Sequence, residues 1–472
     1  MIQKTFTGRA LSSALLLSSL AAGSAAFAQD EGGVRLSFTI EQRLETGRNI
    51  RLTTPEEGNG TLATTRLSFS AVTETRTQSF ALDGMAQLRL ANLPGSGTDT
   101  DLDDHTLRFT YTRESAGSAL RLTAGLDREN LAFPAPLSRF ISETGDIALP
   151  EDFDDRDGGG IRRSRDIAAS LEMGRESTIG SYLEAGASAT RYSGTTDPDL
   201  TGSDTVFARA GLIFRVAPTT TARFDLGYER TDEDDPDLTE TTIRTAALGL
   251  EHELSSRLRM TARLGYRIED TDETPGGLPP TLSARVRGST GSLGFTYDMP
   301  NGTLGADIDS VIDGAGRSTT LRISRAMDLP NNGSLAASLG VTDPEGADAE
   351  LIGSLAYRQE FGPADLIVNA SRRVATNDDD ETSPVDTLAL GYVRHISQAS
   401  RIALAAAFVR TGETPSAAAS EHLDISATYE RDLAPSWALN TGLVYRKRSE
   451  GALSADSPSI FIAISKSFNA RY

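Results

Sequence analysis

The stretch ATYERDLAPSWALNTGLVYRKR (427–448) contains two runs of alternating side chains on either side of a short connection. The larger apolar residues occupy odd positions, up to Tyr429 in the first run and from Trp437 to Tyr445 in the second. Their neighbours are small or polar, as Arg446 is. A period of two predicts two strands, each with one apolar face, joined as a hairpin.

The same alternation continues along the rest of the chain and is interrupted by two classes of connection. One class is short, as in ETRTQ (74–78) and RDLAP (431–435). The other is longer, acidic and variable, as in TDEDDPDLTE (231–240) and VATNDDDETSPV (374–385). Ten short turns alternate strictly with 11 longer loops, which predicts 22 strands with both termini on the short-turn side.

This sorting of connections distinguishes two all-β architectures. A soluble sandwich or propeller also alternates with a period of two, but nothing in it requires short turns at one end. A transmembrane barrel has short periplasmic turns and longer external loops. Because lipid offers no hydrogen-bond partners, its sheet must close. We therefore expect an all-β, closed antiparallel transmembrane β-barrel of about 22 strands (range about 18–24), in which strand 34–45 pairs with strand 459–468.

Aromatic residues recur at two levels of the apolar face, with aliphatic residues between them. Two such levels are typical of girdles at two lipid–water interfaces, although strands are rich in aromatic residues in general. The girdle near the short turns would contain Tyr111, Phe214, Tyr297, Tyr357, Tyr392, Tyr429 and Trp437, and the girdle near the loops Tyr228, Tyr266, Phe408 and Tyr445.

The first 28 residues predict export from the cytoplasm. Lys4 and Arg9 precede an apolar run that ends in the A-x-A sequence 26–28, which is typical of a secretory signal peptide. Residues 29–472 would then form one barrel domain. Without Lys4 and Arg9 the chain has 44 basic and 66 acidic side chains, a net charge of about −22, which repels nucleic acid. The absence of cysteine excludes disulfides and thiolate metal sites.

With these features the chain resembles Gram-negative outer-membrane β-barrel proteins, over nearly its whole length but without a family-specific motif. The resemblance implies contact with outer-membrane lipid and lipopolysaccharide, and insertion by the barrel-assembly machinery. That machinery reads a last strand that ends in an aromatic residue, for which Phe468 and Tyr472 are the candidates, although Lys466 interrupts the apolar series. A TonB-dependent transporter would also carry a plug before the barrel, and about five residues after Gln29 leave no room for one.

A narrower resemblance concerns the C-terminal region. The segments YERDLAPSWALNTGLVYRKR and SPSIFIAISKSF are similar to those of barrels encoded with exopolysaccharide secretion systems. This resemblance implies a conduit for a secreted polysaccharide.

An arginine ladder is the strongest candidate site. On strand 257–267 the apolar parity is even, and the arginines lie on the odd parity. On the next strand a bulge in GSTG (288–291) would bring two more arginines to the same side. The predicted lumen wall consists of Arg257, Arg259, Arg263, Arg267, Arg285 and Arg287. Such a wall binds anions, or its arginines pair with carboxylates on neighbouring strands as a scaffold.

The third external loop, roughly 128–163, is the longest. In diffusion porins the third loop folds into the lumen and sets the constriction, and the resemblance implies the same here. An acidic tract facing the arginine wall would produce a transverse field across the pore; the alternative is an ordinary surface loop. The tract comprises Glu151, Asp152, Asp154, Asp155 and Asp157.

Other candidate chemistry is weak. The acidic loop tips at 232–235 and 378–381 lack the spacing of a dedicated calcium loop, so solvated charge is the default and we expect no metal and no cofactor. The four histidines accompany no catalytic motif, so we expect no enzyme. The leading function is a porin-like channel for small polar or anionic solutes. The alternatives are polysaccharide export and a structural or adhesive barrel with a filled lumen.

Overall fold

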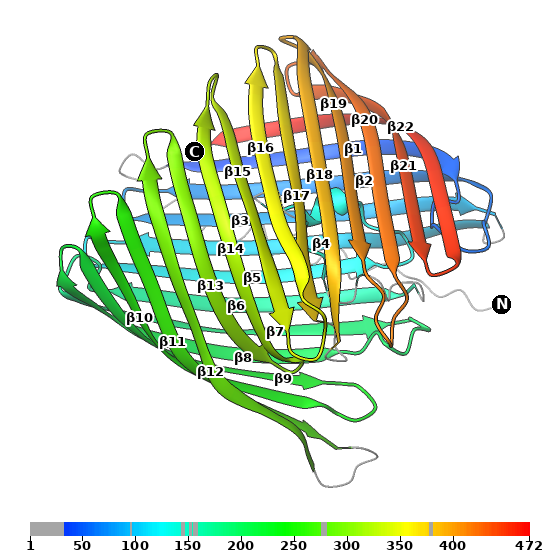
Figure 1. The fold of residues 1–472 in the computed structure, drawn as a ribbon. Helices are drawn as coiled ribbons and strands as arrows, with labels where there is room; N and C mark the ends of the chain where they lie inside the picture. Colours follow the sequence, from blue (N-terminus) through cyan, green and yellow to red (C-terminus); the bar gives the residue numbers. More distant parts are fainter. Residues whose placement is uncertain are drawn as a thin grey trace.

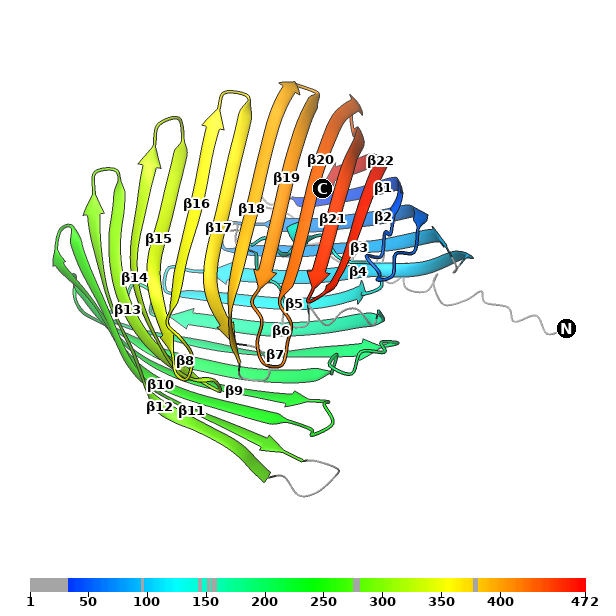
Figure 2. The same cartoon turned by 45° about the vertical axis from the view of Figure 1, so that its right-hand side comes forward.

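One closed sheet of 22 antiparallel strands makes up the fold in the computed structural model (Figures 1 and 2). The structure describes residues 33–94, 97–142, 147–150, 153, 159–274, 281–376 and 381–472, so the signal-peptide prediction lies outside the described residues. Among the described residues no helix is both long and apolar enough to cross a membrane.

The strands follow one another around the barrel in sequence order. Their bounds are β1 (Val34–Arg48), β2 (Asn59–Glu74), β3 (Gln78–Leu93), β4 (Gly97–Glu114), β5 (Ser118–Asn130), β6 (Ile161–Met173), β7 (Ile179–Ser193), β8 (Ser203–Ala217), β9 (Thr220–Glu233), β10 (Glu240–Ser255), β11 (Leu258–Glu273), β12 (Thr281–Met299), β13 (Gly302–Asp313), β14 (Gly316–Leu329), β15 (Gly333–Pro344), β16 (Glu350–Phe361), β17 (Ala364–Thr376), β18 (Thr382–Ser397), β19 (Ser400–Thr411), β20 (Ser420–Ala434), β21 (Trp437–Glu450) and β22 (Leu453–Arg471). A short 3₁₀ helix, η2 (Leu137–Phe140), interrupts the β5–β6 connection.

The barrel closes where the sequence predicts. β1 pairs with β22 from Arg35 opposite Arg471 to Gly47 opposite Ser459. The Val34 N–H donates to the Tyr472 carbonyl at 2.9 Å, and the Tyr472 N–H donates back at 3.0 Å. The closure leaves no free sheet edge, and an unpaired edge would expose unsatisfied backbone groups.

The connections are sorted between the two ends of the barrel as predicted. At one end, ten turns of two to five residues join the strands; at the other, the connections reach 30 residues between Asn130 and Ile161. Both termini lie at the short-turn end, since Val34 pairs with Thr73 beside the β2–β3 turn. The long end is less uniform than expected, because the connections 314–315 and 451–452 contain only two residues.

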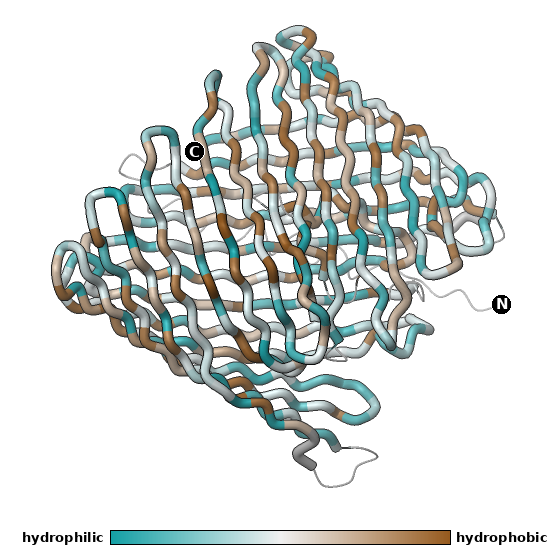
Figure 3. Tube along the Cα trace, in the orientation of Figure 1, coloured by the Kyte–Doolittle hydropathy of each residue, from teal (hydrophilic) through white to brown (hydrophobic). Residues whose placement is uncertain are grey.

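The two faces of the sheet differ in chemistry. Large apolar side chains such as Leu264 (65% exposed) and Leu339 (61% exposed) point away from the barrel interior, and Figure 3 shows hydrophobic and hydrophilic residues alternating along the strands. The inner face is identified by η2, which lies inside the barrel in Figures 1 and 2. Leu137 of η2 packs against odd-numbered residues of β18 and β19, whose even-numbered residues are the outward ones.

All 11 aromatic residues of the predicted girdles share the outward face with these aliphatic residues, as their strand partners show. Their position at lipid–water interfaces stays a prediction. Near the closure the rings of Phe38 and Phe468 lie 6.2 Å apart. The Lys466 Nζ atom lies 4.9 Å from the Trp437 ring centre and 4.8 Å from that of Phe468. These cation–π contacts accommodate the lysine that interrupts the apolar series of the last strand.

We predict that an arginine lowers the free energy of unfolding much more on the outward face of β15 than on its inner face. Leu339→Arg places a charge on the outward, exposed position, which in a bilayer lowers the free energy of unfolding by about 2–4 kcal/mol. Ser338→Arg, at the same depth on the inner face, loses the 2.7 Å hydroxyl contact with Ser354 and costs about 1 kcal/mol. Urea titration of both variants in lipid vesicles measures the difference. Equal costs would contradict the assignment of the two faces.

Candidate functional site

The arginine wall occupies the inner face of β11 only in part. Arg259, Arg263 and Arg267 alternate with the outward residues of the strand, and Arg257 lies in the turn before it. Three of them are paired: Arg259 with Glu251 at 3.5 Å, Arg263 with Asp225 at 3.3 Å and Arg267 with Glu269 at 2.6 Å. These carboxylates neutralise much of the expected positive wall.

Arg285 and Arg287 were assigned wrongly to the lumen. The pairing of β11 with β12 runs without interruption from Leu258 opposite Tyr297 to Thr271 opposite Ala284, so 288–291 contains no bulge. The two arginines therefore share the outward parity of Tyr297, and Arg285 binds Asp270 there. The apolar parity reverses in the sequence because the long-loop end of β12 carries charged residues on its outward side, and no bulge at 288–291 is required.

The predicted lumen loop does enter the barrel. Its acidic residues Glu151, Asp152, Asp154, Asp155 and Asp157 lie outside the described residues, so their position opposite the arginine wall stays a prediction. The described parts of the β5–β6 connection, including η2, fold against the inner face (Figures 1 and 2).

One side of the loop packs in an apolar seat on β18 and β19. Leu137 (1% exposed) and Ile147 (3% exposed) are buried together with Val409 and other inner-face residues of these strands. Phe140 and Phe153 stack edge-to-face at 5.3 Å at its border. The remaining seat residues are Val385, Ala389 and Ala407, with Leu149 and Ala375 at the margin.

Two further contacts attach this side of the loop to β20. The Leu137 N–H donates to the Asp424 carboxylate at 2.6 Å. The Phe153 ring lies 4.8 Å from the His422 ring. Asp424 and His422 lie on the inner face, opposite in parity to the outward Leu423. The seat therefore spans three neighbouring strands.

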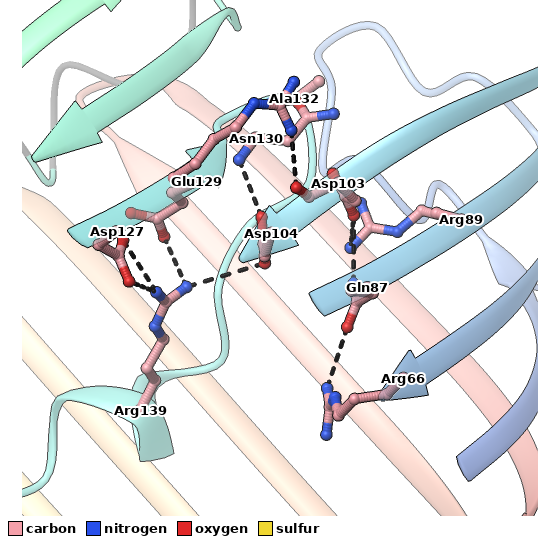
Figure 4. Close-up of polar contacts among 11 residues, drawn as sticks. Arg66, Gln87, Arg89, Asp103, Asp104, Asp127, Glu129, Asn130, Ala132 and Arg139 are labelled. Atoms are coloured by element: carbon pink, nitrogen blue, oxygen red, sulfur yellow. Dashed lines mark hydrogen bonds and ion pairs between the residues drawn. The ribbon is translucent and has the colours of Figure 1, made fainter. Parts of the chain in front are cut away.

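The other side of the loop reaches β4 and β5 through Arg139 (Figure 4). Its guanidinium lies 3.2 Å from Glu129, 3.3 Å from Asp127 and 3.8 Å from Asp104. Between this wall and the seat lie β1–β3, β21 and β22. The loop therefore spans a chord of the lumen, held by ion pairs at one wall and by apolar packing at the other.

A β-bulge directs two carboxylates of β4 toward the side of the loop that is held by ion pairs. The β3–β4 register shifts between Ala86 and Leu88, so that Gln87 faces two residues of β4. Both Asp103 and Asp104 therefore point inward, where a regular strand would direct one of them outward. Asp104 accepts the Asn130 N–H at 2.9 Å, and this bond supports the start of the loop.

Asp103 itself is fully buried and belongs to a polar chain along the wall (Figure 4). Its carboxylate binds Arg89 at 2.5 Å and accepts the Gln87 side-chain amide at 3.1 Å. The Arg89 guanidinium lies 3.9 Å from the ring centre of Phe133, which belongs to the loop. Loop and wall are thus joined by a buried ion pair covered by an aromatic ring.

Sequence reasoning located the loop but missed its anchors. Asp103 and Asp104 were not among the candidate residues, and the structure places them in β4. Val385 and Val409 gave a signal that could have been used, since they are apolar residues on the parity that elsewhere faces the lumen. Among the described residues no group of three or more histidine, aspartate or glutamate side chains could hold a metal ion.

Comparisons with known proteins identify the fold. No family model matches the chain, and no curated protein matches its sequence. Among solved structures, the FrpB iron transporter from Neisseria meningitidis covers 95% of this chain and aligns over 83% of its own, with a TM-score of 0.59 and 10% identity. The ferric-catecholate import receptor Fiu from E. coli K12 covers 93% and aligns over 82%, with a TM-score of 0.57 and 9% identity. The siderophore receptor PirA from Pseudomonas aeruginosa covers 93% and aligns over 81%, with a TM-score of 0.53 and 12% identity.

We predict that a charge in the apolar seat releases the loop. Leu137→Asp removes a buried side chain whose loss costs about 2–5 kcal/mol and places a carboxylate beside Asp424. Cleavage within residues 131–160 by a soluble protease, in the folded protein, should become at least about tenfold faster. Ser138→Asp, which adds the same charge at the neighbouring exposed position, should leave the cleavage rate unchanged. Equal rates for the two variants would contradict the seat.

Proposed function

We propose that this chain is an integral outer-membrane barrel that provides a passage for small polar solutes, narrowed by the β5–β6 loop. An apolar outward face around a closed 22-stranded sheet supports the membrane location. The sorting of short turns and longer connections supports it too, and it favours a periplasmic position for the short-turn end and both termini. The similar structures include an iron transporter and a ferric-catecholate import receptor.

The observation that carries the proposal is the loop anchored across the lumen. A surface loop would bury its apolar residues against the outer rim, whereas this loop buries Leu137 against the inner face of β18 and β19. At the opposite wall Arg139 meets three carboxylates. Such a loop reduces the cross-section at a fixed depth and adds its own polar groups to the path, which is how a wide barrel becomes selective by size.

The charge pattern favours a weakly selective passage. Arg259, Arg263 and Arg267 each lie beside an inner-face carboxylate, so the β9–β11 wall presents alternating charges. The Tyr182 hydroxyl also donates to Asp225 at 2.8 Å, which extends this network to β7. Paired charges attract neither anions nor cations strongly. The preference for anions that an unpaired arginine wall would give is therefore reduced.

A closed barrel with a structural role is the second candidate, favoured by the same seated loop. In that case the loop blocks the lumen, and no solute passes. Polysaccharide export would in turn require the loop to leave its seat, since a chain of sugars is wider than a small solute.

Planar-bilayer recording separates these functions. We expect a measurable conductance for the purified, folded protein, and a larger one when residues 132–158 are replaced by a short Gly-Ser linker. A barrel that conducts only after the replacement is a closed one, which would contradict the channel. No conductance in either protein would contradict passage altogether.

The charge network gives a second test, by reversal potential in a salt gradient. Arg263→Gln leaves Asp225 without its cationic partner, so the selectivity should shift toward cations. Asp225→Asn leaves Arg263 unneutralised and should shift it toward anions. Shifts in the same direction, or none, would show that this wall lies outside the conducting path.

A further inference from the structure

Four arginines gather on the outward face at the long-loop ends of β5, β6 and β7. Arg128 pairs in register with Arg163, and Arg163 with Arg191. Arg165 lies two residues further along β6, opposite the outward Leu126. Strand spacing separates Arg128 from Arg191 by about 10 Å, and Arg163 from Arg165 by about 7 Å. The patch is therefore wide enough for a headgroup with more than one anionic group.

Several outward arginines near this end of the barrel are paired with a carboxylate. Arg48 has Asp456 at 2.8 Å, Arg244 has Asp270 at 3.0 Å, and Arg230 has Asp232 at 2.8 Å. Arg191 follows this pattern with Asp234 at 3.4 Å and Asp204. Arg287 on β12 has no carboxylate within 4 Å among the described residues.

Arg163 and Arg165 do not follow this pattern of pairing either. Arg163 donates to the Ser193 hydroxyl at 3.0 Å. Neither Arg163 nor Arg165 has a carboxylate within 4 Å in the described part of the chain, and both are exposed. The positive charge of this pair is therefore left for a ligand. Arg128 adds a guanidinium held in place by the Asp103 carbonyl at 2.6 Å.

An apolar hollow of about 510 Å³ lies on the same outward face, directly beside Arg165. Its outward lining includes the small residues Ala124, Ala187 and Ala189 between the larger Leu126, Ile167 and Val206. Small side chains flanked by large ones leave a depression in the outer surface of the barrel, with the shape and polarity to take an acyl chain.

Taking the membrane placement proposed above as its basis, we propose that this surface binds a phosphorylated, acylated glycolipid of the outer leaflet, namely the lipid A part of lipopolysaccharide. Guanidinium forks match phosphate oxygens in bidentate geometry, and the hollow receives an acyl chain beside them. The position at the long-loop end selects the outer leaflet. A headgroup with two phosphates spans the patch, whereas a phospholipid presents one.

The test uses the full chain in detergent, titrated with bisphosphorylated lipid A, with its dephosphorylated form and with phosphatidylglycerol, and binding read by native mass spectrometry. The double variant R163Q/R165Q removes the two unneutralised charges. R287Q is the matched control, because Arg287 is an outward arginine on β12, distant from the hollow. Far-ultraviolet circular dichroism confirms that each variant is folded.

We expect R163Q/R165Q to weaken the binding of bisphosphorylated lipid A at least about tenfold and R287Q to leave it unchanged. Unaltered binding by the double variant overturns the site. Equal binding of the dephosphorylated form would show that the arginines do not recognise phosphate. Equal binding of phosphatidylglycerol would show that the surface binds phospholipids in general. Either result overturns the proposal.

A second variant tests the hollow separately. Ala187→Leu fills its floor and should weaken lipid A binding several-fold without removing any charge. Failure of the barrel to insert into vesicles is a different outcome, because it contradicts the membrane location proposed for the whole chain. Lipid binding without conductance, in contrast, would contradict only the passage.

Discussion

The continuous backbone hydrogen-bond ladder is the constraint on which the rest of the structure depends. Each strand pairs on both sides, and the β1–β22 register closes the circle between residues more than 400 positions apart in sequence. A sheet with apolar side chains such as Leu264 and Leu339 exposed on its outer face can keep this ladder intact in hydrocarbon only when no edge remains. Closure therefore makes the outward apolar face tolerable, and it creates the lumen.

The lumen then sets the conditions for the loop. A barrel of 22 strands is too wide for wall side chains alone to fill, so a 30-residue connection can enter and find partners on two walls. The partners differ in kind. Apolar packing around Leu137 supplies burial, while the cluster around Arg139 supplies ion pairs in a partly shielded site, where they are stronger than at an open surface.

Much of the fold could be predicted because a period of two and the sorting of turns are local signals. The strand number and the β1–β22 closure are confirmed. The error at 288–291 arose because the alternation rule assumes an apolar outward face along the whole strand, whereas Arg285 and Arg287 lie on the charged long-loop end of β12.

The candidate site was less predictable, because its pairs join distant strands. The carboxylate beside Arg263 lies on β9, two strands away. Whether an arginine is open or neutralised depends on such neighbours. The two inward aspartates of β4 depend on a one-residue bulge that the alternation does not show.

The most direct test of the account is a nitroxide scan along β15, residues 334–342, in lipid vesicles. The chain contains no cysteine, so each single cysteine can be labelled alone. Odd positions should be accessible to oxygen dissolved in lipid and even positions to a water-soluble nickel reagent, with a period of two. Accessibility to water on both faces, or no alternation, would contradict a barrel with hydrocarbon outside and water inside.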